Sequence, residues 1–253
     1  MNHCIIKRDL HGNYRISFFS DFRSVKNDIV SSSRNYDYES FARSKRTVID
    51  YGMNNDFDFF VTITFDGKKV DRYNSHSVLR KLQNALKDYR RFYDCDFAYV
   101  LVPERHADGA IHFHGLFKIG RTDLVERHFD VKRRCVYYRI EFFYRRLGRF
   151  RMDKIATNAT YVSAYITKYM TKENERIFQR RYICSKGLHS GDVVVNVSGD
   201  DAIPFLDIML AHCVFCTGEI LDIKPVVNRD FCRIYSLDET TFRMLFYNVN
   251  PNP

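Results

Sequence analysis

The alternation of hydrophobic and polar positions is clearest in the middle of the chain. Residues 57–65, FDFFVTITF, combine aromatic and β-branched side chains and end at Asp66-Gly67, which predicts a buried strand that stops at a turn. Between Ser77 and Phe92 apolar side chains recur every three or four residues, which predicts an amphipathic helix with Ser75 or Ser77 as its N-cap. The predicted order is therefore strand, then helix.

Two further apolar runs follow this helix and have the length of strands. They cover residues 97–102 and 111–117, and the polar segment between them contains Asp108-Gly109, a turn-forming pair. Helical spacing is also found at 38–51 and 159–174, and a short strand with its exit turn is indicated at 181–187. We expect an α+β fold with a central antiparallel sheet of about five strands and flanking helices, resembling the ferredoxin or RNA-recognition type.

One main domain with two extensions is expected. The 253 residues, 45% of them hydrophobic, are enough to bury a sizeable core. Residues 1–50 are polar and rich in Ser and Arg, so we expect an N-terminal arm there, the main domain at 51–190 and a C-terminal extension of unknown role at 191–253. The sequence has no run of about 18 uncharged apolar residues, which argues against a membrane span.

Positive charge is concentrated in one part of the chain. Forty Lys and Arg against 31 Asp and Glu give a formal net charge of +9, and residues 132–151 hold a dense group of basic side chains with Glu141 as the one acid. Aromatic side chains are interleaved with them between Tyr137 and Tyr144. This composition fits a nucleic-acid strand with stacked bases, and a basic amphipathic helix with one solvated face would produce it equally well.

The seven cysteines do not form a disulfide framework. Their number is odd and the polar start, Met1 to Leu10, does not have the pattern of a secretory signal, so we expect a reduced, cytoplasmic protein. Cys213 and Cys216 have the spacing of a zinc-ligand pair, but a structural zinc site needs four ligands and no second close pair is present. Two buried thiols are the favoured interpretation.

Two histidines separated by one apolar residue form the first candidate site. On a strand, His112 and His114 point to the same face while Phe113 packs behind them. Pairing across the Asp108-Gly109 turn brings Glu104 to the neighbouring strand opposite them, so a carboxylate joins the two imidazoles. Such a set can bind Mg²⁺ or Mn²⁺ and leave positions open for phosphate oxygen and water. A mononuclear iron site with the same ligands is the alternative.

Tyrosines at helical spacing form the second candidate site. Positions four apart differ by about 40° around a helix axis, so Tyr165 and Tyr169 can face the same site. Lys168 and Lys172 each follow one of these tyrosines by three residues, where an ammonium group favours a phenolate or binds phosphate. Tyr161 shares this face and makes Tyr161/Tyr165 an alternative pair. Tyr165 is the preferred nucleophile because Lys168 accompanies it.

With the motifs in this order, the chain resembles the HUH endonucleases, and within them the rolling-circle replication initiators of phages and plasmids. The resemblance rests on the strand motif at 60–65, the metal motif from Glu104 to His114 and the paired Tyr-x-x-Lys units at 165–172. In these proteins a His-hydrophobic-His metal site and a helical tyrosine act together on single-stranded DNA. The tyrosine follows the histidines here, as in the initiators.

The resemblance implies an enzyme that nicks and rejoins single-stranded DNA at a replication origin. Its nucleophile would become a 5′-phosphotyrosine and free a 3′-OH for a polymerase, and the second tyrosine would support strand exchange. The chain lacks a Gly-x-x-x-x-Gly-Lys-Ser/Thr phosphate loop, so duplex unwinding is expected from a host helicase. The implied site residues are Tyr165, Tyr169 and Lys168 for catalysis, and His112, His114 and Glu104 for the metal.

Three other functions share some of these features. A transposase of the single-tyrosine kind has the same motif order and chemistry, and the paired Tyr-x-x-Lys units favour an initiator over it. A non-enzymatic single-strand binder explains the charge and the aromatic side chains but needs no metal site. An iron oxygenase explains the two histidines and the carboxylate but not the tyrosines. The initiator is therefore the expected function.

Overall fold

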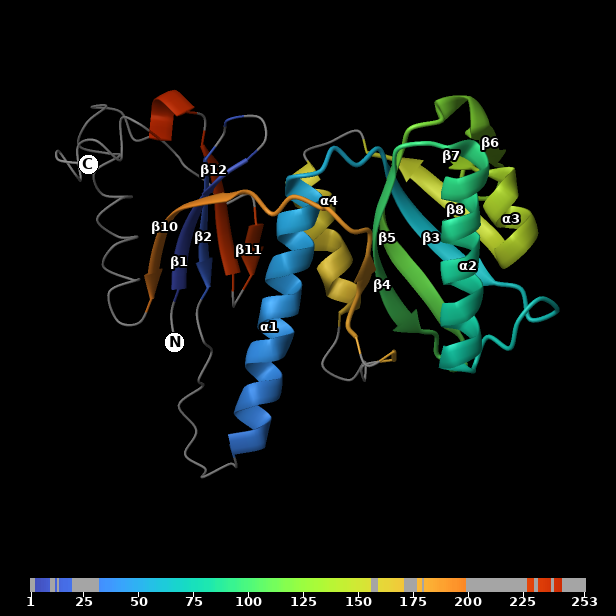
Figure 1. Ribbon diagram of the computed structural model, residues 1–253, viewed down its shortest axis with the longest axis horizontal. Helices are drawn as coiled ribbons and strands as arrows, with labels where there is room; N and C mark the ends of the chain where they lie inside the picture. The colour runs from blue at the N-terminus through green and yellow to red at the C-terminus, as the bar shows by residue number, and fades with distance from the viewer. Residues whose placement is uncertain are drawn as a thin grey trace. The chain divides into compact units, whose positions relative to one another are not determined.

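The computed structural model divides the chain into two compact units, each with its own antiparallel sheet (Figure 1). The larger unit is Ser31–His189, and the smaller unit combines Met1–Val30 with Ser190–Pro253. The structure describes residues 3–9, 12, 14–19, 32–155, 159–170, 177–178, 180–198, 227–229, 232–237 and 239–242. The predicted zinc-like pair, Cys213 and Cys216, lies outside the described residues.

Strands from both ends of the chain build the smaller unit. Their order in the sheet is β10-β1-β2-β12-β11. The bounds are His3–Arg8 for β1, Tyr14–Phe19 for β2, Asp192–Ser198 for β10, Val227–Arg229 for β11 and Cys232–Leu237 for β12. Residues 1–30 are thus grouped with the C-terminal segment and not with residues 31–50, which differs from the arm and extension expected. Pairing between opposite chain ends leaves no local sequence pattern, because alternation shows that a strand forms but not its partner.

Seven antiparallel strands form the sheet of the larger unit, in the order β6-β7-β8-β3-β5-β4-β9. The bounds are Phe59–Phe65 (β3), Phe97–Arg105 (β4), Ile111–Ile119 (β5), Glu126–Asp130 (β6), Cys135–Arg139 (β7), Gly148–Lys154 (β8) and Ile183–Cys184 (β9). The predicted α+β class with a central antiparallel sheet is confirmed. The β6–β7 hairpin and the short β9 extend the sheet beyond the expected five strands.

Helices cover both faces of this sheet (Figure 1). Ser32–Met53 (α1) and Ala159–Ile166 (α4) lie on one side, and Ser75–Tyr93 (α2) and Glu141–Leu147 (α3) on the other. With these helices the central strands follow the chain order β3-α2-β4-β5-α3-β8 and the spatial order β8-β3-β5-β4, which is the ferredoxin-like arrangement. None of the helices among the described residues combines the length and the apolar character needed to cross a membrane.

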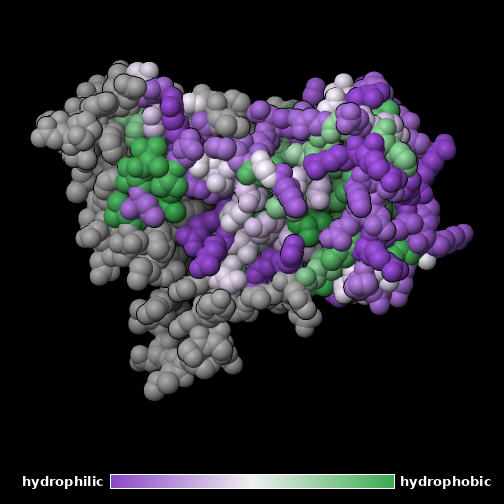
Figure 2. All heavy atoms as spheres, in the orientation of Figure 1, coloured by the Kyte–Doolittle hydropathy of each residue, from purple (hydrophilic) through white to green (hydrophobic). Residues whose placement is uncertain are grey.

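Alternation along β3 separates a core face from a site face. Phe59, Val61, Ile63 and Phe65 are buried in one cluster with the apolar side of α2, while the residues between them face the other way. Phe113 joins the same cluster, as predicted from its position between the two histidines. Hydrophilic side chains cover most of the face of the larger unit that is visible in Figure 2. The polar side of β3 and β5 is therefore available for chemistry.

Three local predictions are corrected by the structure. The N-cap of α2 is Asn74, whose side-chain oxygen accepts a hydrogen bond of 2.9 Å from the Ser77 N–H, in place of Ser75 or Ser77. The helix expected over 159–174 ends at Ile166 and continues as a 3₁₀ turn, Thr167–Tyr169; residues 171–176 lie outside the described part. The basic segment 132–151 is not one amphipathic helix, because β7, α3 and the start of β8 share it.

Gly115 in the middle of β5 has no space for a side chain. A Cβ there would lie 2.0 Å from the Val100 carbonyl oxygen and 2.9 Å from the Leu101 Cα, both in the backbone of β4. Gly115→Ala should therefore push two central strands apart and lower the free energy of unfolding by roughly 3 kcal/mol, measured by urea denaturation. Gly67→Ala is the control, because nothing lies within 4 Å of its Cβ. Equal losses in the two variants would contradict the steric explanation.

Candidate active site

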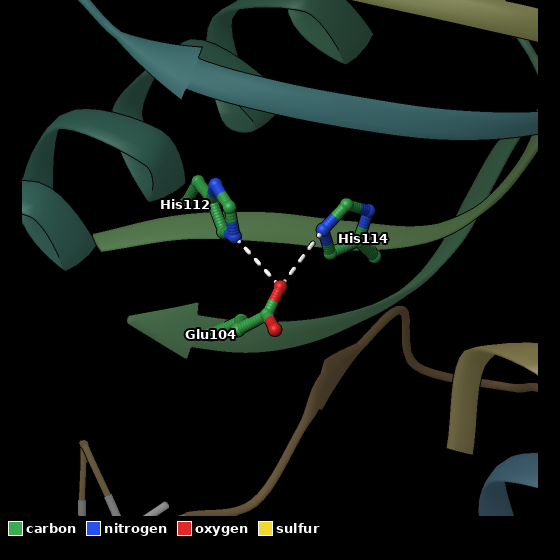
Figure 3. Close-up of side chains that lie close together, drawn as sticks. All are labelled: Glu104, His112 and His114. Atoms are coloured by element: carbon green, nitrogen blue, oxygen red, sulfur yellow. Dashed lines mark hydrogen bonds and ion pairs between the residues drawn. The ribbon is translucent and has the colours of Figure 1, made fainter. Parts of the chain in front are cut away.

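Glu104, His112 and His114 point toward one another from two neighbouring strands, β4 and β5 (Figure 3). The register pairs Glu104 with His112, and Val102 with His114, as the Asp108-Gly109 turn predicted. Glu104 Oε2 lies 2.8 Å from His112 Nε2 and 3.1 Å from His114 Nε2. One carboxylate oxygen and two imidazole nitrogens therefore converge, and this triad could hold a divalent ion.

Burial keeps both imidazoles in the neutral form that binds metal ions. His112 and His114 are 5% and 8% exposed. Burial lowers the pKa of His112 below its ordinary value, against the opposing hydrogen bond to Glu104. Burial, followed by repulsion from His112, lowers the pKa of His114 to about 4. At neutral pH the ring nitrogens therefore need to lose no proton before a cation binds.

The site face of β3 contributes two residues that the sequence analysis did not single out. Thr62 lies opposite His114, and its Oγ1 is 3.2 Å from His114 Nδ1. A proton on Nδ1 can be donated to this hydroxyl, which leaves Nε2 free to face Glu104 and an ion. Phe60 packs its ring against His114 and Tyr165, with centroid distances of 5.9 Å and 5.7 Å. Strand alternation was the available signal, since every residue of β3 outside the core must face the histidines.

Tyr165 and Tyr169 lie in the same cavity as the two histidines, a space of about 510 Å³. The Tyr169 ring stacks on His114 with the centroids 3.8 Å apart, and its hydroxyl donates a hydrogen bond of 3.1 Å to the Tyr165 hydroxyl. The change from α-helix to 3₁₀ turn at Thr167 does not separate the two phenols, because their ring centroids remain 5.7 Å apart. The tyrosines and the triad thus form one site.

The surroundings of the two phenols shift their acidity in opposite directions. A hydrogen bond with Lys168, followed by the one from Tyr169, lowers the pKa of Tyr165. Burial, followed by the hydrogen bond to Tyr165, raises the pKa of Tyr169. The exposed Lys168 ammonium lies 3.6 Å from the centroid of the Tyr165 ring and 4.8 Å from that of Tyr169. Tyr165 is therefore the more acidic phenol of the pair.

The alternative pair from the sequence is only partly described by the structure. The backbone of Tyr161 belongs to α4, but its side chain is outside the described part, as is Lys172, the lysine that follows Tyr169 by three residues. The choice between Tyr161/Tyr165 and Tyr165/Tyr169 stays a prediction. Tyr165 belongs to both pairs.

The low pKa of His114 should make the protein less stable in mild acid. The unfolded chain has a histidine pKa of about 6.5 and the folded His114 of about 4, so the unfolded state binds more protons between these values. The contribution is therefore complete above about pH 6.5 and is lost as the pH falls through 4, on the order of 3 kcal/mol. Urea denaturation at several pH values measures it. His114→Gln should show a correspondingly weaker pH dependence, and equal curves for both proteins would disprove the assignment.

Comparison with known proteins concerns the residues that form this site. Residues 58–174 match the model of a family of replication-associated proteins, described as the ORF2 type. The match covers a little less than half of the chain, from β3 through the triad to both tyrosines. No curated protein and no solved structure matches the chain. The part of the chain that carries the candidate site is therefore the part that is similar to this replication-associated family.

Proposed function

We propose that this protein is a replication initiator that nicks and rejoins single-stranded DNA through a 5′-phosphotyrosine. The observation that carries the proposal is a phenol with a lowered pKa in the same cavity as three convergent metal-ligating side chains. The similarity of residues 58–174 to a replication-associated family supports the biological setting. An oxygenase would use the same triad, but it leaves the pairing of Tyr165 with Lys168 without a purpose.

Glu104, His112 and His114 are the proposed ligands of a divalent ion, Mg²⁺ or Mn²⁺. Their ligand atoms all lie within 4.8 Å of one another, and both imidazoles are neutral near pH 7, so the donor set fits such an ion. When bound, the ion acts as a Lewis acid on a non-bridging phosphate oxygen. Three protein ligands leave further positions for phosphate and water.

Tyr165 is the proposed nucleophile, because the contact with Lys168 makes its phenolate more accessible. Attack by the phenolate oxygen on phosphorus forms the Oη–P bond and breaks the bond from phosphorus to the 3′ oxygen. The 3′ oxygen takes up a proton and leaves as a 3′-OH, while the 5′ phosphate stays on the protein. Since the phosphodiester is conserved in this link, attack by a 3′-OH can reverse the step and rejoin a strand without a nucleotide cofactor.

Tyr169 is proposed to act in strand exchange after Tyr165 has been occupied. It lies in the same cavity, touches His114 directly and is within reach of the same lysine. Its raised pKa requires that the proton first leaves for another group, for example the Tyr165 oxygen that accepts its hydrogen bond. A single-tyrosine transposase would not need this second phenol. In this proposal a host helicase and a host polymerase supply unwinding and synthesis.

End-labelled hairpin oligonucleotides with a randomised single-stranded region test the proposed reaction. With Mg²⁺ or Mn²⁺, label should remain on the denatured protein only when it was placed at the 3′ end, because the fragment with the new 5′ end is the one attached. EDTA should abolish the adduct. Attachment of the 5′-labelled fragment, or cleavage without an adduct, would contradict the tyrosine mechanism. Oxygen consumption with Fe²⁺ would indicate the oxygenase instead.

A further inference from the structure

A second cavity, of about 680 Å³, adjoins the site cavity on the side of β8. The two share Thr64, Arg149 and Arg151 in their linings. The register places Arg149, Thr64 and His112 in one row across β8, β3 and β5, so Arg149 starts about 10 Å from the triad at ordinary strand spacing. A chain-like ligand in the site cavity can therefore continue into the second one past Arg149.

The two arginines that separate the cavities differ in charge compensation. Arg151 is half-buried and pairs with Asp130 at 3.1 Å and Asp153 at 3.0 Å, so its charge is neutralised within the fold. Arg149 is exposed, and within the part of the chain that the structure describes no acidic side chain pairs with it. A guanidinium group with its donors open is suited to a phosphate, because it offers a planar fork of N–H groups.

The β6–β7 hairpin forms one wall of this second cavity and carries an unusual tip. Phe129 is 60% exposed and Val131 78% exposed, although both are large apolar side chains. Lys132, Arg133 and Arg134 follow in the turn, all exposed and without an ion pair to any residue that the structure describes. Exposed aromatic and cationic groups side by side provide a stacking surface for a base next to contacts for its phosphate.

The opposite wall holds aromatic rings already combined with guanidinium groups. Arg151 lies over the Tyr137 ring at 4.9 Å, and Arg139 over the Tyr144 ring at 4.3 Å. Lys69 lines the same space. The lining thus alternates flat rings and cations and suits unpaired bases, whose faces are open. In duplex DNA the bases are already stacked on one another, so these rings would have nothing to stack on.

We propose that this groove, between the β6–β7 hairpin and the β8 side of the sheet, binds the single-stranded DNA that runs next to the cleaved phosphate. Arg149 contacts a phosphate at the junction of the two cavities, and Phe129 stacks on a base in the groove. The position of the cleaved bond rests on the proposed function, but binding in the groove does not. These two side chains act as positioning residues for the strand and touch neither the ion nor the nucleophile.

Equilibrium binding of a fluorescent oligothymidylate in EDTA tests the groove without any cleavage. Arg149→Ala should weaken binding several-fold and lower the slope of log K against log salt by about 0.7, the value for one phosphate contact on a single strand. Phe129→Ala should weaken binding about five- to tenfold at every salt concentration, and Phe129→Tyr should restore it. All three variants replace exposed side chains, so unchanged melting curves are expected.

Matched controls come from α2, on the opposite side of the sheet. Arg80→Ala removes an exposed arginine there, and Phe92→Ala removes a phenylalanine that is 56% exposed. Both should bind within twofold of the unchanged protein. Equal losses in groove and control variants, no loss in Arg149→Ala and Phe129→Ala, or equal competition by duplex DNA would overturn the proposal.

The two proposals can fail separately. If the adduct forms at Tyr165 but the groove variants bind the oligothymidylate normally, the groove assignment falls and the proposed function stands. If the groove variants lose binding as expected but the protein forms no adduct, the nicking reaction falls and the groove stands.

Discussion

Replacing Tyr165 with Phe should abolish the covalent protein–DNA adduct and reduce cleavage by roughly four orders of magnitude or more. The variant loses only the hydroxyl, so the ring keeps its contacts with Phe60 and with the Lys168 ammonium and the fold is preserved. The effect is large because the hydroxyl is the group that forms the new bond to phosphorus. Gel-shift of the denatured protein with a 3′-labelled oligonucleotide measures it.

Tyr169→Phe is the matched control for this result. It removes the hydrogen bond that Tyr165 accepts, which helps to lower the pKa of Tyr165. We expect the first cleavage to persist at a rate reduced several-fold, with the optimum moved to higher pH, and strand exchange to be lost. Peptide mapping of the adduct should identify Tyr165. An adduct that persists in Tyr165→Phe and maps to Tyr161 or Tyr169 would reassign the nucleophile.

Removing a ligand of the triad should have the second large effect. Glu104→Gln keeps the size of the side chain but removes its negative charge, so two neutral imidazoles remain as the only strong donors. The affinity for Mn²⁺ should fall by roughly a hundredfold or more, because the carboxylate supplies the charge that attracts the cation. Cleavage should fall with it. Isothermal titration calorimetry with Mn²⁺ measures the affinity directly.

Asp153→Asn provides the corresponding control for metal binding. Asp153 lines the same cavity and its change of charge is identical, but it pairs with Arg151 and is not one of the three convergent ligands. Its Mn²⁺ affinity should stay within a few-fold of the original. If Glu104→Gln binds Mn²⁺ normally, or if the two variants lose affinity equally, the triad is not the metal site.

Local sequence patterns were sufficient for the central strands and for the triad. Alternation identified β3, β4 and β5 as strands, and the Asp108-Gly109 turn set the register that brings Glu104 opposite His112. Both signals act over a few residues: side chains alternate with a period of two, and a turn determines the pairing of the strands that it joins. The same reasoning placed Tyr165 and Tyr169 four residues apart on one face.

Tertiary packing decided what those residues can do. Tyr165 and Tyr169 carry the same side chain, but only their contacts with Lys168, His114 and each other lower one pKa and raise the other. Arg149 and Arg151 are equally spaced members of one basic segment, and only the fold pairs Arg151 with two carboxylates. Acidity and open charge depend on neighbours that are distant in the chain, and so does the joining of both chain ends in one sheet. Composition and spacing alone carry no record of such neighbours.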